Sequence, residues 1–478
     1  MNGSAYYSFP TKETIMATLN EVPGQAAASP RRSWPGPKGH WLFGCLRAIR
    51  SDPRNFYRAA ARTYGDYVRI PTLPGVDVFL LVDPAAVEHV LVKNPKNYRK
   101  PAFLTGPVRQ VVGNGLFISE GDFWLRQRRL AQPAFLRGAI TRFAAPMTAA
   151  ADRLIRDWEA APDGRIVDVV PEMMRLVLQI AGATLCGADV GAEADTIGAG
   201  QRDISAFVSH KMNNMLTAPL WFPTRRNRAF QRSKALLDGL VLRLIESRRR
   251  SGAPTKDLLG MLLAARDEES GTGMSDKQLK DEVLTLLFAG HDTTSAALSW
   301  AWRLLAKHPE IQEALHDEAF ALLAGRTPTA EDLPRLPLAT AVFEETLRLY
   351  PPAPALARQA LGPDEINGYP VPAKAIVMPS QWVTHRHPAY WDEPDEFRPE
   401  RFLPGGGTNR PKFAYFPFGG GPRVCIGNTF ALLEGALVLA ALAQRFQLSP
   451  ADDQEVEIDV TFVLRPKGAV NLVVRKRS

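Results

Sequence analysis

The sequence is poor in cysteine, with only 3 among 478 residues. These are Cys45, Cys186 and Cys425, which lie far apart, and the N-terminus shows no signal peptide. Small domains that depend on disulfides are dense in cysteine, and zinc sites need about four ligands at close spacing. The sequence therefore excludes a disulfide scaffold and a cysteine-rich zinc module, and it predicts a reduced, cytoplasmic protein.

Long apolar runs and long charge runs are also missing. The longest apolar stretches, 283–290 and 435–443, fall well short of the ~20 residues that a membrane-spanning helix needs, so we expect no transmembrane anchor. The net charge is +8, but the basic runs at 126–129, 225–228 and 248–250 are short and contain no interleaved aromatic residues. Such runs are typical of solvated helix faces, and we predict no nucleic-acid partner.

Helical periodicity dominates the middle of the chain. Residues 122–446 are mostly helical in pattern, whereas strand patterns are found at 67–73, 77–83, 369–381 and 456–474. The predicted fold class is therefore mainly α with a minor β-sheet subdomain.

The chain shows one change of character, close to its N-terminus. Residues 1–34 are rich in Ser, Ala, Pro and Thr without apolar periodicity, and we predict a flexible tail there. At ~150 residues per domain the length allows about three domains, but nothing after residue 34 resembles an interdomain tether. We therefore expect a single domain over 35–478, acting as a monomer.

The strongest local signal is the segment FGGGPRVCIG at 418–427, which precedes a long apolar helix pattern. Cys425 falls at the start of that helix, where backbone N–H groups and the helix dipole are expected to lower the pKa of a thiol. The three glycines permit a tight fold against a flat ligand, and a thiolate so placed can bind iron. A small buried cysteine and a nucleophile with a base nearby in space are the alternatives.

A second signal lies in the middle of a predicted helix over 276–307. Ser275 and Gln278 have the spacing of a capping box, and the apolar helix is interrupted by AGHDTT at 289–294. The hydroxyl of Thr293 can compete for the carbonyl of Ala289, four residues earlier, and so open a groove for a diatomic ligand. Asp292 is then placed to relay protons. A helix kink with satisfied hydroxyls is the alternative reading.

Two further pairs have helical spacing. Glu345 and Arg348 lie three residues apart, and PDEFRPERF at 394–402 supplies Arg401, which is expected to complete a buried Glu-Arg-Arg network. Trp124 and Arg128 stand one turn apart and present an indole N–H and a guanidinium, both suited to carboxylates.

Together these motifs resemble the cytochromes P-450. The haem-binding signature of that family is matched at Phe418, Gly421, Arg423, Cys425 and Gly427. The oxygen-binding A-G-x-D-T-T, the E-x-x-R with P-E-R-F pair and the W-x-x-x-R helix follow the family's order. The resemblance implies haem b (iron protoporphyrin IX), held in a triangular-prism fold between the long central helix and the helix after the cysteine loop.

The resemblance also implies the role of each residue. Cys425 becomes the axial iron ligand, Phe418 packs beside its sulfur, and Glu345, Arg348 and Arg401 become structural. Asp292 and Thr293 become the catalytic pair that manages protons. The remaining cofactor-binding positions implied are Trp124, Arg128, Ala289, Gly290, Arg358, Arg423 and Gly427, with the arginines and the tryptophan on the haem propionates.

The predicted function is a haem-thiolate monooxygenase that activates dioxygen with two external electrons to hydroxylate or epoxidise a lipophilic molecule, such as a terpenoid, steroid, fatty acid or polyketide. The electrons are expected from a separate ferredoxin, flavodoxin or flavin reductase, which docks near the basic run at 126–129. A haem-thiolate peroxygenase or isomerase and a non-catalytic haem-binding protein are the alternatives. The acid and alcohol at Asp292 and Thr293 favour the monooxygenase.

Family position also predicts the segments that line the substrate pocket, which are mostly apolar and include Phe207. These segments are 100–117, 204–222, 287–294, 355–357 and 461–464.

Overall fold

The computed structural model describes residues 32–477 except 188–193, 215–216, 252–256, 408 and 461–462. The predicted tail lies outside the described residues up to position 31. Its last residues do have defined partners. The N–H of Arg32 donates to the carbonyl of Gly368 at 2.9 Å, and the indole of Trp34 donates to that of Pro370 at 2.7 Å. The end of the predicted tail therefore packs on the hairpin around residue 368.

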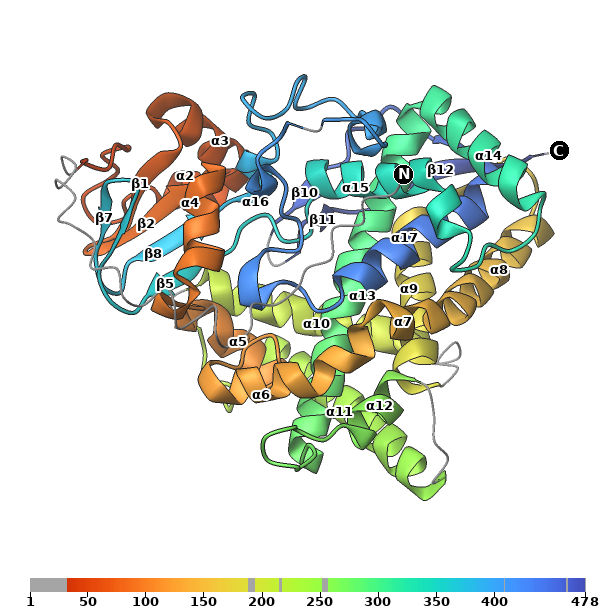
Figure 1. The fold of residues 1–478 in the computed structure, drawn as a ribbon, viewed down its shortest axis with the longest axis horizontal. Coiled ribbons are helices and arrows are strands. Elements are labelled where there is room, and N and C mark those ends of the chain that lie inside the picture. Colours follow the sequence, from red (N-terminus) through yellow and green to blue (C-terminus); the bar gives the residue numbers. More distant parts are fainter. Residues whose placement is uncertain are drawn as a thin grey trace, which may run out of the picture.

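Helices form most of the molecule, as predicted (Figure 1). A single-turn π-helix, η1 (His89–Lys93), extends α4, and η8 (Gly421–Arg423) is a short 3₁₀ turn. The α-helices of the described residues are α2 (Leu46–Ser51), α3 (Pro53–Tyr64), α4 (Pro84–Glu88), α5 (Ala102–Val112), α6 (Gly121–Ala131), α7 (Arg137–Ile140), α8 (Ala144–Ala160), α9 (Val169–Cys186), α10 (Ala194–Asn213), α11 (Arg225–Ser251), α12 (Leu258–Ala264), α13 (Asp276–Lys307), α14 (Pro309–Leu323), α15 (Pro337–Leu349), α16 (Gln381–Thr384) and α17 (Asn428–Ala443).

The strands form small sheets at the edges of the helical body. A five-stranded mixed sheet has the order β1-β2-β8-β5-β3, and β2 and β8 in it run parallel. A three-stranded sheet has the order β4-β12-β9, and two hairpins pair β6 with β7 and β10 with β11. The bounds are β1 (Tyr67–Leu73), β2 (Val76–Leu81), β3 (Tyr98–Arg99), β4 (Arg165–Asp168), β5 (Arg358–Ala360), β6 (Asp364–Ile366), β7 (Tyr369–Val371), β8 (Ile376–Pro379), β9 (Phe446–Pro450), β10 (Ile458–Asp459), β11 (Arg465–Pro466) and β12 (Asn471–Lys476).

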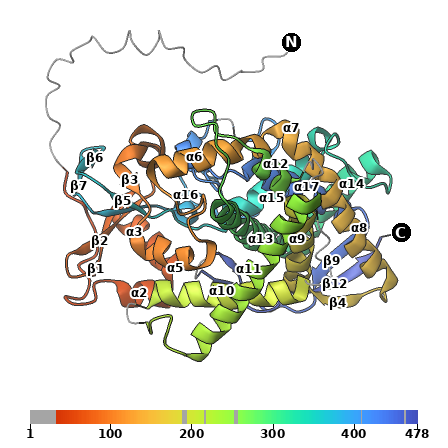
Figure 2. The ribbon, with the colours of Figure 1, turned by 90° about the horizontal axis from the view of Figure 1, so that it is seen from below.

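Helix α13 is the axis of the helical body. It has the predicted bounds and the predicted capping box, in which Ser275 and Gln278 bond each other's backbone N–H groups. It packs against α9, α11, α15 and α17, and Figure 2 shows it nearly end-on among its neighbours. Its side chains from Ala296 to Leu305 are buried without interruption, because the helix is mostly apolar there and its polar members, Ser299 and Arg303, bond the carbonyls of Ser295 and Gln454.

Helix α17 is buried along its second half and packs on α8 and α15. Gly435 allows this close approach, because an added Cβ would lie 2.5 Å from the ring of Phe343. Within the part of the chain that the structure describes, no helix is long and apolar enough to cross a membrane.

Candidate active site

The cysteine loop is folded tightly against the N-terminal part of the chain. Gly421 has φ +66°, and a Cβ on it would lie 1.8 Å from the carbonyl oxygen of Leu91 in η1. A Cβ on Gly420 would lie 2.5 Å from the ring of Phe413. Only glycine fits these positions, and the turn is closed by the N–H of Cys425, which donates to the carbonyl of Phe418 at 3.0 Å.

The sulfur of Cys425 faces a space inside the protein. Its surface is exposed, yet burial within the molecule raises the pKa of its thiol. The N–H of Gly427 and the charge of Arg128 lower the pKa, but by less. The predicted lowering of the pKa is therefore wrong for the protein alone, because desolvation outweighs the helix start. Binding to a metal cation reverses that balance and deprotonates a thiol.

The middle of α13, like Cys425, has accessible surface although its surroundings are buried. Ala289 and Gly290 are exposed and Thr293 is partly exposed, although the helix around them is buried. The hydroxyl of Thr293 donates to the carbonyl of Ala289 at 2.8 Å, as the spacing predicts. Asp292 and His291 lie on the other side and are buried, and His291 turns toward α9. Accessible space in a buried core leaves room for a ligand.

Cations gather around a small cavity between the cysteine loop and the segment before α6. The cavity is lined by Lys100, Arg358 and Arg423, together with Glu120. Burial and the charges of Arg358 and Arg423 lower the pKa of Lys100 to about 7. Burial lowers the pKa of Arg358 to about 10. Arg99 also lines the cavity, so four cations share one carboxylate, and the cavity is short of negative charge.

The predicted tryptophan and arginines lie beside this cavity. The guanidinium of Arg423 lies 3.8 Å from the centre of the Trp124 ring and is also paired with Glu120. Arg128 donates to the carbonyl of Val424 at 3.0 Å, and Arg358 lies on β5 and donates to the carbonyl of Ala357 at 3.0 Å. Sequence-distant residues are thereby brought to one edge of the cysteine loop.

The predicted Glu-Arg-Arg group is present and buried. Arg348 donates to Glu345 through Nε at 2.6 Å and through Nη2 at 2.7 Å, and both side chains have 0% exposure. Arg401 lies 3.4 Å from Glu345. Arg348 also donates to the carbonyls of His385, Pro394 and Glu396, so the group joins α15 to the segment before η6 (Pro399–Phe402).

Comparison with known proteins agrees with these features. A family model described as cytochrome P450 matches residues 34–473. The chain belongs to the cytochrome P450 family. It is 35% identical over 436 residues to cyclooctat-9-en-7-ol 5-monooxygenase of Streptomyces melanosporofaciens, covering 90% of this chain and 93% of that protein. It is 30% identical to pentalenene oxygenase of Streptomyces avermitilis, covering 86% and 90%. The solved haem domain of cytochrome P450DA superposes with a TM-score of 0.86 at 28% identity, covering 94% and 99%.

Membership confirms the predicted fold class, a monooxygenase activity and haem as the cofactor. The described residues fit haem on three independent counts. The Cys425 sulfur is accessible inside the molecule, the turn of α13 at Ala289 and Gly290 is open, and the cavity at the loop's edge has more cations than carboxylates. Haem contains an iron that binds a thiolate, which matches the accessible sulfur of Cys425. It also carries two propionate carboxylates, which match the excess of cations in the cavity.

The basic run of α6 is less available than predicted. Arg129 pairs with Asp267 at 3.0 Å and with Glu269 at 2.5 Å. Arg126 donates to the loop before α13, to the hydroxyl of Thr272 at 2.9 Å. Arg128 donates to the cysteine loop, so all three arginines make contacts within this P450.

The pocket prediction is wrong for Phe207. This ring is fully buried and stacks on Phe230 with centroids 3.9 Å apart, so it belongs to the contact of α10 with α11. Of the predicted pocket segments, 215–216 and 461–462 lie outside the described residues. Phe103 and Phe117 are partly exposed, with 49% and 37% of their surface accessible.

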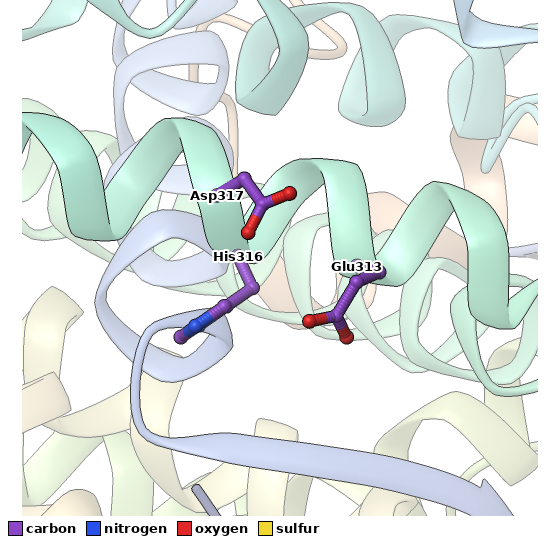
Figure 3. A group of neighbouring side chains, drawn as sticks. All are labelled: Glu313, His316 and Asp317. Carbon is purple, nitrogen blue, oxygen red and sulfur yellow. The ribbon is translucent and has the colours of Figure 1, made fainter. Parts of the chain in front are cut away.

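Another group of potential metal ligands lies on α14, where Glu313, His316 and Asp317 have ligand atoms within 4.8 Å of one another (Figure 3). Glu313 is paired with Arg477 at 2.8 Å, and His316 bonds the carbonyl of Ala443 at 3.2 Å. These contacts with other segments of the protein account for Glu313 and His316 as surface side chains of this P450.

Sequence reasoning missed Lys100 and Glu120 as parts of the cationic cavity. The backbone N–H of Lys100 donates to Glu120 at 3.2 Å, and its ammonium donates to the carbonyl of Phe117. Both residues flank loops without helical or strand periodicity, and only the fold brings them beside Arg358 and Arg423. The polar Glu120 directly before the W-x-x-x-R helix was the available signal.

Proposed function

We propose that this P450 hydroxylates or epoxidises a terpenoid-like lipophilic substrate. Two of its relatives are named for oxygenation of cyclooctat-9-en-7-ol and pentalenene, and the apolar side chains of the predicted pocket segments suit a molecule of that kind. The observation that carries the proposal is the open turn of α13 at Ala289 and Gly290, next to the bond between Thr293 and the Ala289 carbonyl.

We assign Cys425 as the residue whose thiolate would bind the haem iron, with Phe418 and Gly427 shaping its loop. Arg128, Arg358 and Arg423, supported by Trp124, would hold the propionates, and Lys100 joins them. Haem bound here supplies the redox centre at which dioxygen is reduced by two electrons. Ala289 and Gly290 place nothing larger than a methyl group at the open turn, which would leave room for a small diatomic substrate.

Thr293 and Asp292 are assigned to proton delivery. The Thr293 hydroxyl lies in the open turn, where it could accept a proton and pass on the one that it now donates to the Ala289 carbonyl. Asp292 lies one residue earlier with 8% of its surface exposed, and its carboxyl accepts the hydroxyl of Ser205 at 3.0 Å. The peroxygenase and isomerase alternatives do not need this pair.

Glu345, Arg348 and Arg401 are assigned a structural role. Their contacts fix the segments that precede the cysteine loop, and none of them reaches the open turn. Electrons come from a separate protein, and a ferredoxin, a flavodoxin and a flavin reductase remain the candidate donors. We keep the monomeric state and the cytoplasmic location as predictions.

The carbon monoxide difference spectrum of the reduced protein tests the ligand assignment. The wild type is expected to give the red-shifted band of a thiolate-bound haem, and Cys425→Ala is expected to lose it. Cys45→Ala is the matched control, because that cysteine is buried away from the loop. A wild-type spectrum without the shifted band would refute the proposed function.

Thr293→Ala tests the proton assignment. The variant should bind haem but divert the consumed electrons into peroxide instead of product. Thr346→Ala is the control, because the Thr346 hydroxyl makes the same bond to a carbonyl four residues earlier, at 2.8 Å, inside α15. Coupling as tight as in the wild type would argue against proton delivery by Thr293.

A further inference from the structure

Glu120 stands at the start of α6 but does not cap the helix. It is the N-cap residue, yet its side chain bonds none of the first N–H groups of α6. Its Oε1 accepts the backbone N–H of Lys100 at 3.2 Å, and its Oε2 accepts Nη2 of Arg423. A carboxylate at a helix start usually stabilises the helix itself. This one is instead turned toward the cations beside the cysteine loop.

The four cations of that cavity have only one carboxylate bond between them. Arg99, Lys100 and Arg358 bond uncharged oxygens, namely a side-chain amide and two backbone carbonyls. Among the described residues, the pair of Arg423 with Glu120 is the only bond that joins a cation of this cavity to a carboxylate. Like charges that lack counter-charges repel one another, so Glu120 stabilises the cation group.

The guanidinium of Arg423 has three partners. Nη1 donates to the carbonyl of Ser119 at 2.7 Å, and Nη2 donates to Glu120. Its central carbon lies 3.8 Å from the centre of the Trp124 ring. The carbonyl and the indole are uncharged partners, which leave the positive charge available. The bond to Glu120 is therefore the contact that a second carboxylate would replace.

The two members of this ion pair differ in exposure. The side chain of Arg423 is 18% exposed, whereas that of Glu120 is 36% exposed. A carboxylate that already contacts water is released at lower cost than a guanidinium that is packed against an indole. When another carboxylate reaches Arg423, Glu120 is thus the partner that leaves.

A haem propionate is such a carboxylate. With Glu120 still bound, a propionate approaching Arg423 would meet a like charge at the same nitrogen. Both cannot hold Nη2 at once, because one N–H group makes one strong bond.

We propose that Glu120 holds the place of a haem propionate on Arg423, and that haem binding exchanges the Glu120 ion pair for a propionate ion pair. The inference rests on the proposed function, in which Arg423 holds a propionate. One ion pair forms for each that breaks, and the released Glu120 carboxylate is hydrated. Glu120 is then a positioning residue, which keeps the guanidinium over Trp124 before haem arrives and competes with the propionate afterwards.

Loss of haem from the holoenzyme measures this competition. Glu120→Gln keeps an oxygen for the Lys100 N–H but removes the charge that competes for Arg423. Transfer of haem to an excess of apomyoglobin should therefore slow about fivefold, which is the effect of a partly exposed ion pair. Asp122→Asn is the matched control, because it removes an exposed negative charge from the first turn of α6, and it should lose haem at the wild-type rate. Haem loss from Glu120→Gln as fast as from the wild type, or faster, would overturn the proposal.

A double variant tests whether Glu120 acts through Arg423. Arg423→Gln should lose haem faster than the wild type, because the propionate loses its guanidinium. Adding Glu120→Gln to that variant should produce no further change, since two residues that act through one contact are not additive. If Glu120→Gln slows haem loss equally in both backgrounds, its charge acts on haem from a distance, and the exchange is refuted.

The propionate bending bands in the resonance Raman spectrum report the bonds of the propionates directly. Because Glu120 has left Arg423 in the holoenzyme, these bands should be the same in the wild type and in Glu120→Gln. They should shift in Arg423→Gln. A shift in Glu120→Gln would mean that Glu120 still shares the guanidinium when haem is bound, which contradicts the exchange.

The two levels of inference fail separately. If Arg423→Gln keeps haem as long as the wild type and leaves the propionate bands unmoved, the propionate assignment of Arg423 fails. If Arg423→Gln behaves as expected but Glu120→Gln does not slow haem loss, the exchange alone fails. The carbon monoxide spectrum tests the thiolate ligand independently of both.

Discussion

Replacing Glu345 by glutamine should destabilise the protein strongly. The substitution keeps the shape of the side chain and removes its charge, which leaves the guanidinium of Arg348 buried at 0% exposure without a counter-charge. Removing one partner of a buried ion pair costs about 3–5 kcal/mol. Unfolding entropy is about 2.1 cal/mol/K per residue, or about 1 kcal/mol/K for 478 residues. The expected fall in Tm is therefore about 3–5 °C.

Thermal unfolding of the haem-loaded protein, followed by circular dichroism at one fixed scan rate, measures this shift. Glu457→Gln is the matched control, because Glu457 pairs with Lys467 at 2.5 Å on the surface, with 71% and 66% of the two side chains exposed. Exposed pairs contribute about 0–1 kcal/mol, so the control should melt within about 1 °C of the wild type. Equal Tm values for the two variants would refute the reasoning.

Three further outcomes are expected. Burial raises the pKa of Glu282 to about 7, above the ~4.3 of an exposed glutamate, so stability falls by about 4 kcal/mol as pH rises between these values. Glu282→Gln should flatten that slope in denaturant titrations, and an unchanged slope would contradict the assignment. Gly421→Ala should prevent haem retention through its overlap with the Leu91 carbonyl, whereas Gly164→Ala, with φ +74° and open space around it, should retain haem. Haem should bind the apo-protein about fivefold more weakly at about pH 8 than at about pH 7, because Lys100 loses its proton near pH 7, and Lys100→Met should abolish this dependence.

Local patterns predicted the elements whose causes are local. The bounds of α13 followed from a capping box and apolar periodicity, and β1 occupies the predicted residues 67–73. The partners within one helix turn, such as Thr293 with Ala289 and Glu345 with Arg348, also followed from spacing. These interactions need only the geometry of a helix.

Other features depend on the fold and were missed. Strand β4 lies in a segment that reads as helical and forms because β12 pairs with it. The raised pKa of Cys425 comes from enclosure by distant segments, which no helix-start argument contains. The partner of His291 on α9 is 117 positions away, so this contact is visible only in three dimensions.

The pairing of β2 with β8 has a consequence for synthesis of the chain. Residues Val78–Leu81 leave the ribosome early, but their parallel partner, Ile376–Pro379, is made almost 300 residues later, and β4 must wait for β12 near the C-terminus. At about 5–20 residues per second, the first sheet has one edge unpaired for roughly 15–60 seconds. An exposed strand edge invites pairing with other chains during that interval. Yield in expression should therefore depend on translation speed and chaperone supply more than the stability of the finished protein suggests.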